Sequence, residues 1–143
     1  MKGRKTMKES ICTFIGLVGA WIAAAFGGWS ASLSTLIILM AADYITGLVV
    51  AGVFHKSPKT DQGGLNSNVG WMGLAKKVMV LLFVLVAHRL DLVLGVSYAK
   101  DAVCIAYIVN ELLSLIENAG LMGVPIPDAI KSAIEVLQRK DEK

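Results

Sequence analysis

Residues 11–54 read ICTFIGLVGAWIAAAFGGWSASLSTLIILMAADYITGLVVAGVF, a run with a single formally charged side chain, Asp43. A transmembrane helix needs about 20 predominantly apolar residues, so this run is long enough for two spans joined by a tight turn. The turn is expected at residues 29–32, the most polar patch in the run, because Trp29 is typical of a membrane interface. The stretch therefore predicts a helical hairpin, with helices over residues 11–28 and 33–54.

The composition supports a membrane protein. The chain has 143 residues, of which 55% are hydrophobic and 17% charged, whereas a soluble domain carries about 25% charged residues. A small soluble protein also has too much surface to hide so much apolar material. We therefore expect a single, all-α integral membrane domain over residues 1–143, without room for a separate catalytic domain.

The rest of the chain is less regular. Residues 55–77 are polar and rich in glycine and predict a loop. Two apolar runs interrupted by charged residues predict helices over 78–95 and 99–119, and helical spacing of apolar residues after Pro127 predicts an amphipathic helix over 125–140. The expected fold has about four transmembrane helices, arranged as two hairpins, and a C-terminal amphipathic helix. Three spans are the alternative, and the tail either lies on the membrane or packs against a partner helix.

Lysine and arginine gather in residues 1–10 and in the loop at 55–77, while the two expected outer turns carry few charges. Short segments rich in these residues stay in the cytoplasm. Both termini are therefore expected on the cytoplasmic side of a multi-pass membrane protein. Lys76 and Lys77 are expected to anchor the third helix by reaching the lipid headgroups. A cleaved signal peptide is the alternative interpretation of the start.

Four ionisable residues form a predicted intramembrane polar cluster: Asp43, Arg89, Asp91 and Glu111. Each charge costs about 2.5–3.5 kcal/mol at the centre of a membrane helix, so pairing, protonation or water has to compensate it. Asp43 and Arg89 are expected at similar depth, where an ion pair could form. Because the three carboxylates outnumber the arginine, at least one carboxylate should be protonated or face water.

Two helix faces carry further patterns. In the helix at 99–119, polar residues recur every three or four positions and form one stripe, comprising Asp101, Cys104, Tyr107, Glu111, Ser114 and Asn118. This stripe is either a polar seam inside the bundle or a surface that becomes water-lined when subunits assemble. In the first helix, small residues recur every four positions, which favours close helix association in lipid; they are Gly16, Ala20, Ala24 and Gly28.

The signatures of catalysis are absent. The glycines of the loop lack the Gly-Lys-Ser/Thr sequence of a phosphate-binding loop. No serine lies in a nucleophile-elbow context, and the two histidines fall in different environments. We expect no enzyme, no cofactor, no metal site and no nucleic-acid partner.

Two groups of motifs resemble a known family. The first group comprises Asp43-x-x-x-Gly47, the Lys76-Lys77 pair and Asp91, and the second comprises Glu111-x-x-Ser114-x-x-x-Asn118 and the following junction with Gly123, Pro125 and Pro127. Together they resemble the toxin-secretion/phage-lysis holin family, which includes the holin-like protein of clostridial toxin loci. The resemblance covers residues 33–137, and the proline-containing junction is its most specific part. The first helix matches no motif of the family.

The resemblance implies a phage- or prophage-encoded protein that accumulates in the host cytoplasmic membrane. It would form homo-oligomers and then lesions that release an endolysin or a toxin and so time host cell lysis. The endolysin or toxin would be a functional partner without direct binding. Initiation at Met7 would give a shorter product, as in holins with two start sites, where the longer product acts as an antiholin; a single start is the alternative.

Two other classes of function fit the same residues. A small ion channel or proton-coupled transporter would use Asp43 as its relay. A non-conducting scaffold or antiholin would regulate another membrane protein. The size of the leakage discriminates between them, because a holin lesion passes a folded enzyme and a channel passes ions only.

Overall fold

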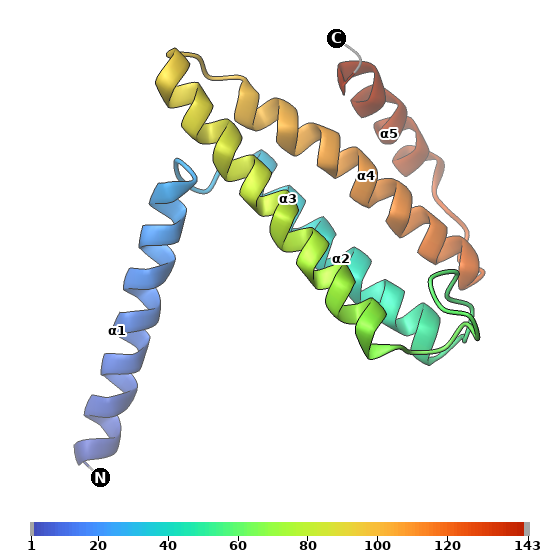
Figure 1. Ribbon diagram of the computed structural model, residues 1–143, viewed down its shortest axis with the longest axis horizontal. Helices are drawn as coiled ribbons and strands as arrows, with labels where there is room; N and C mark the ends of the chain where they lie inside the picture. Colours follow the sequence, from blue (N-terminus) through green and yellow to red (C-terminus); the bar gives the residue numbers. More distant parts are fainter. Residues whose placement is uncertain (1, 142–143) are drawn as a thin grey trace. The chain divides into compact units, whose positions relative to one another are not determined.

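The computed structural model describes residues 2–141 and, over that range, contains five helices and no strand (Figure 1). The helices are α1 (Lys2–Ala25), α2 (Ala31–Gly52), α3 (Ser67–Leu94), α4 (Ala99–Leu121) and α5 (Asp128–Asp141). The expectation of an all-helical fold is thus confirmed. Three segments of the described chain are long and apolar enough to cross a membrane, namely Gly3–Ala25, Ala31–Gly52 and Ala99–Leu121.

The chain divides into two compact units between Ser30 and Ala31. In the first unit the helix starts at Lys2, so the basic N-terminal segment is helical and not an extension ahead of a helix at residue 11. The helix ends at Ala25, and Gly27 and Gly28 follow with φ angles of 75° and 91°, a left-handed conformation that favours glycine. Of the small residues expected on one face, Gly28 therefore lies in the turn and not on α1.

In the second unit, α2, α3 and α4 form a bundle in which α4 packs against both other helices. Hydrogen bonds join α2 to α4 at a nearly constant sequence separation, from Ser32 to Asp101 and from Thr46 to Asn118. A nearly constant separation means that α2 and α4 run parallel. Helix α3, which connects them in the sequence, runs in the opposite direction. The fully buried side chains of this bundle are Leu33, Leu36, Val50, Val84 and Cys104.

Helix α3 begins eleven residues earlier than the apolar pattern predicts, at Ser67 instead of residue 78. The reason is a cap: the Asn66 side-chain oxygen accepts hydrogen bonds from the backbone N–H groups of Asn68 (3.0 Å) and Val69 (3.3 Å). Gly70 lies inside the helix, and the Tyr44 hydroxyl donates to its carbonyl oxygen at 3.3 Å. The loop between α2 and α3 is therefore residues 53–66, and not 55–77.

Asp91 organises the turn between α3 and α4. Gly95 ends α3 with φ 66°, and its N–H donates to the Asp91 carbonyl. The Asp91 carboxylate accepts from the backbone N–H groups of Ala99 and Lys100, both at 2.9 Å. These are amides that the first turn of a helix leaves without an intrahelical partner. Asp91 thus caps α4 and lies outside the intramembrane cluster in which the sequence placed it.

Replacing Asp91 with alanine is expected to loosen the start of α4. Without the carboxylate the Ala99 and Lys100 amides lose their acceptor, and their hydrogen exchange should accelerate about tenfold or more. The measurement is amide exchange in detergent micelles, with Arg89→Ala, an exposed change on the same helix, as the control. Equal exchange at these two amides in both variants would show that the cap is dispensable.

Helix α5 follows the junction with the two prolines. Gly123, with φ 77°, ends α4, and the Val124 N–H donates to the Ala119 carbonyl at 2.9 Å. Pro127 stands immediately before the first residue of α5. Helix α5 contacts α4 of the same chain and buries Ile134. The tail helix therefore has an intramolecular partner.

Candidate functional site

A buried ion-pair network joins the three helices of the bundle. The Lys77 Nζ of α3 donates to Asp43 Oδ2 of α2 at 2.8 Å and to Glu111 Oε2 of α4 at 2.6 Å. The side chains of Lys77, Asp43 and Glu111 are 15%, 9% and 6% exposed, so the ammonium and both carboxylates are largely shielded. One cation thus holds two anions that come from different helices.

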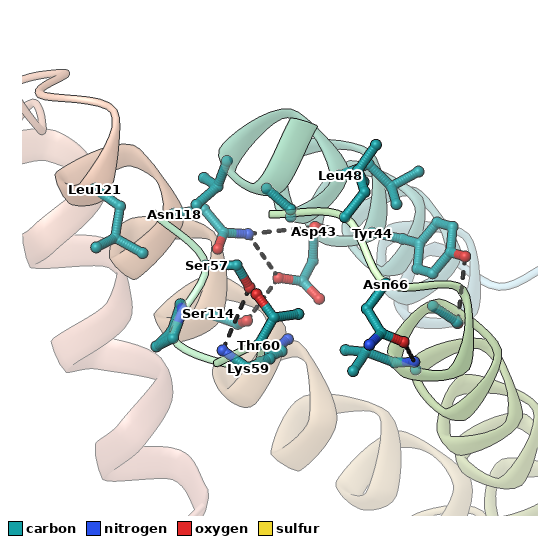
Figure 2. Close-up of a pocket in the computed structure, with 18 of the residues that line it drawn as sticks. Asp43, Tyr44, Leu48, Ser57, Lys59, Thr60, Asn66, Ser114, Asn118 and Leu121 are labelled. Carbon is teal, nitrogen blue, oxygen red and sulfur yellow. Dashed lines mark hydrogen bonds between the residues drawn. The ribbon is translucent and has the colours of Figure 1, made fainter. Parts of the chain in front are cut away.

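The second oxygen of Asp43 is also occupied. Asp43 Oδ1 accepts from the Ser114 hydroxyl at 2.6 Å and from Asn118 Nδ2 at 3.1 Å, both on α4 (Figure 2). Asn118 Nδ2 also lies 2.9 Å from Thr46 Oγ1 of α2. Within the described residues no buried side-chain nitrogen or oxygen lacks a hydrogen-bond partner. The network is therefore satisfied in its closed form, as buried polar groups must be to avoid a large penalty.

The three charged groups lie at one level of the bundle. Asp43 is nine residues before the end of α2, Lys77 ten residues after the start of α3, and Glu111 ten residues before the end of α4. At 1.5 Å per residue each group is about 15 Å from the same end of the bundle. This depth is about half of the 30 Å hydrocarbon core of a bilayer.

The formal charge of the network is −1, because two carboxylates share one ammonium. Taking ionised groups out of water is unfavourable, and only their mutual attraction and hydrogen bonds offset this. The closed arrangement satisfies the hydrogen bonds but leaves one negative charge uncompensated. A change that brings water to these groups would therefore release electrostatic free energy.

The structure brings together only part of the predicted cluster. Asp43 and Glu111 share one network, but Arg89 is exposed and makes none of the ion pairs found among residues 2–141. The expected Asp43–Arg89 pair is replaced by the Asp43–Lys77 pair, because the earlier start of α3 moves Lys77 to the level of Asp43. Lys77 is thus a network residue and not a surface anchor, whereas Lys76 is exposed.

The polar stripe of α4 faces its neighbours in the bundle, and only its first member, Asp101, is exposed. Asp101 accepts from the Ser32 hydroxyl at 2.6 Å, Glu111 binds Lys77, and Ser114 and Asn118 bind Asp43. Cys104 is fully buried, and Tyr107 is half-buried. In this arrangement the stripe forms a polar seam, which is one of the two interpretations that the sequence left open.

A cavity of about 120 Å³ adjoins Asp43 and is bounded by the α2–α3 loop (Figure 2). The loop has a defined conformation. Gly63 has φ 72°, and a Cβ added there would lie 2.2 Å from the carbonyl oxygen of His55. The Ser57 N–H donates to the Gly63 carbonyl at 3.0 Å, and the Thr60 hydroxyl donates to the Gly64 carbonyl at 2.9 Å.

Gly63→Ala is therefore expected to displace the loop. The left-handed conformation alone costs a non-glycine residue about 1–2 kcal/mol, and the clash with the His55 backbone adds to this. Limited proteolysis in micelles should then cut residues 53–66 faster. Gly64→Ala is the matched control, because its Cβ would meet only the flexible His55 side chain, at 3.6 Å. If both variants were cut at the wild-type rate, Gly63 would not hold the loop.

The distribution of side chains defines a class of protein. Charged and amide groups lie inside the bundle, while large apolar side chains point outward from α2, α3 and α4, among them Ile38, Ile45, Leu82, Phe83, Val86 and Leu113. This is the arrangement of a helical membrane protein, in which buried ionisable residues face the interior of the bundle and pair with one another.

Comparison with known proteins identifies the family. The bacteriophage holin family matches residues 20–139, so the chain belongs to this family. A "probable holin" of Bacillus phage phi105 is 30% identical over 112 residues, which are 78% of this chain and 77% of that protein. The protein is therefore a non-enzymatic helical membrane protein of the holin family, as the motifs indicate.

Two further relatives carry no functional description in their names. An uncharacterised protein of Halalkalibacterium halodurans is 39% identical over 133 residues, covering 89% of this chain and 93% of its own length. An uncharacterised 14.9 kDa protein from the region 3′ of nagH in Clostridium perfringens is 36% identical over 128 residues, covering 88% of this chain and 89% of its own length. No solved structure matches the chain.

Among residues 2–141, no group of three or more His, Cys, Asp or Glu side chains is placed to hold a metal ion.

The apolar pattern of the sequence did not predict that Lys77 belongs to the network. Asn66 followed by Ser67 and Asn68 is the signal that could have predicted it, because this pattern is typical of a helix start ahead of the lysines.

Proposed function

We propose that this protein is a phage or prophage holin that oligomerises in the bacterial cytoplasmic membrane and forms lesions that release an endolysin or a toxin. One observation carries the proposal: the Asp43–Lys77–Glu111 network places two carboxylates and one ammonium at half the depth of an apolar-surfaced bundle. Such a network is held by its internal bonds while the bundle is closed and gains hydration when the bundle opens. Membership of the holin family supports the same function.

The proposed topology has four spans and cytoplasmic termini. Helix α3 is 28 residues long, about 42 Å at helical rise, and its residues 78–87 carry no charge. Lys77 in this helix has its charge shared by two carboxylates, which lowers the cost of placing it in lipid. With α3 as a span, the basic loop at 53–66 and the basic N-terminus both face the cytoplasm, as the positive-inside rule favours.

Assembly would replace internal contacts with contacts between subunits. Gly16, Ala20 and Ala24 form an exposed face of small residues on α1, which suits close approach of a second helix. Where α2 separates from α4, Asp43, Ser114 and Asn118 would line the opening. Loss of membrane potential would act on the same charges, since one charge crossing the full membrane corresponds to about 2.3 kcal/mol per 100 mV.

The test is inducible expression in a bacterium, alone and together with a cytoplasmic endolysin. We expect abrupt loss of culture density only when the endolysin is also present. A folded cytoplasmic reporter enzyme should then appear in the medium, once the endolysin has digested the cell wall. Abrupt lysis requires a lesion wide enough for protein. Stable culture density with both proteins present would contradict the proposal and would leave a scaffold or antiholin.

An ion channel is the second candidate, because the cavity of about 120 Å³ lies directly beside Asp43. A channel would dissipate ion gradients without passing protein. Release of potassium but not of the reporter enzyme from the same cells would favour it over a holin.

A further inference from the structure

We propose that the cavity beside Asp43 is a water-filled vestibule, open at the α2–α3 loop, which brings solvent to the polar network before subunits assemble. The inference deepens the proposed function and rests on it only for the compartment that the loop faces. The vestibule belongs to the closed subunit and not to the lesion.

The position of the cavity connects the network with the surface. One part of its wall is made by the buried side chains of Asp43 and Asn118, and another part by the exposed residues Lys59 and Glu117. The same wall includes loop residues and the first turns of α3, which lie at the loop end of the bundle (Figure 2), and we place the opening there. A continuous path therefore leads from the charged groups to the polar loop.

The polar part of the wall suits water. Hydroxyl groups come from the loop (Ser57 and Thr60) and from α4 (Ser114), and the Lys77 ammonium lies at the network end. A buried water needs two to four polar partners and about 10–15 Å³ of free space. A cavity of about 120 Å³ meets both conditions for several water molecules.

Solvent in this position would stabilise the unbalanced charge of the network. Two carboxylates and one ammonium leave a formal charge of −1, and an uncompensated charge in hydrocarbon is costly. Contact with water on one side offsets part of that cost, and the remainder is released only when the bundle opens. The network would then exchange protons and small cations with the compartment on the loop side only.

Thiol reactivity tests the vestibule in the intact protein. In a background with Cys12→Ser and Cys104→Ala, Gly47→Cys places a thiol on the cavity wall, where a Cβ meets only Asn118 Nδ2, at 3.9 Å. Ile45→Cys is the matched control, since it lies two residues away on α2 but on the exposed outer face. The probe is a cationic, membrane-impermeant methanethiosulfonate, added to inverted vesicles or to spheroplasts at expression levels below lysis.

The Gly47→Cys thiol is expected to react about tenfold or more faster than the Ile45→Cys thiol, and from one side of the membrane only, because the thiolate needs water to form. Reaction no faster than the control, or reaction from both sides, overturns the vestibule. Reaction from the periplasmic side alone keeps the vestibule and contradicts the proposed orientation. If Gly47→Cys fails to accumulate, Ser114→Cys reports from the opposite wall by the same criteria. Labelling does not require lysis. A negative lysis test would therefore contradict the proposed function without contradicting the vestibule.

Discussion

Replacing Lys77 with methionine is expected to destabilise the α2–α3–α4 bundle by about 3–5 kcal/mol, because removing one partner of a buried ion pair leaves its counter-charges unpaired. Two carboxylates, Asp43 and Glu111, lose their shared cation in this variant. Methionine keeps the flexibility and most of the length of the side chain, so the loss reports mainly on charge. The measurement is the free energy of unfolding in mixed micelles, followed by circular dichroism.

The neighbouring lysine supplies the control. Lys76 is exposed and lies outside the network, and Lys76→Met is expected to change the free energy of unfolding by less than about 0.5 kcal/mol. The double variant Glu111→Gln/Lys77→Met should recover part of the loss, since it removes one of the two unpaired anions. If Lys77→Met were as stable as Lys76→Met, the network would not hold the bundle.

Glu111→Gln is expected to delay lysis. The glutamine carbonyl can still accept from Lys77, but the formal charge of the network changes from −1 to zero, which favours the closed bundle. An uncompensated charge costs about 2.5 kcal/mol at the centre of a membrane helix. If Glu111→Gln stabilises the closed bundle by half of this, the barrier to opening rises and opening slows about tenfold. The measurement is the time from induction to loss of culture density in the presence of an endolysin.

A carboxylate elsewhere provides the reference for this experiment. Glu135 is exposed on α5, so Glu135→Gln removes the same charge from the chain without touching the network, and its lysis time should match the wild type. Both variants must first accumulate in the membrane to equal amounts. Unchanged or earlier lysis with Glu111→Gln would mean that the unbalanced charge does not drive opening.

The helices and the family followed from the sequence because their signals are local. Apolar runs of helical length predict α2 and α4, and the expected limits of the α4 helix differ from the observed ones only by its last two residues. The motif that includes Glu111, Ser114 and Asn118 identifies a stripe of residues that do share one face. Spacing along one helix is fixed by its geometry, so such patterns translate directly into positions.

The partner of Asp43 could not be predicted in the same way. The depth of a residue in α3 depends on where the helix begins, and the sequence predicts a start at Val78 because the glycines at 70 and 73 are typical of a loop. Helical glycines are tolerated there because Tyr44 of α2 packs against them, and such a tertiary contact leaves no trace in local sequence. An error of eleven residues in the start of α3 placed Arg89, rather than Lys77, opposite Asp43.

The capping of α4 by Asp91 constrains how α3 and α4 can part. Their adjoining ends are tied by two hydrogen bonds that backbone N–H groups of α4 donate to the Asp91 carboxylate, whereas their far ends, at Ser67 and Leu121, are joined to each other by no direct chain connection. Any movement between them is therefore angular, with its pivot near Gly95 and its largest displacement at the opposite end of the bundle. The polar groups nearest to that wide end would be the first to gain further contact with water.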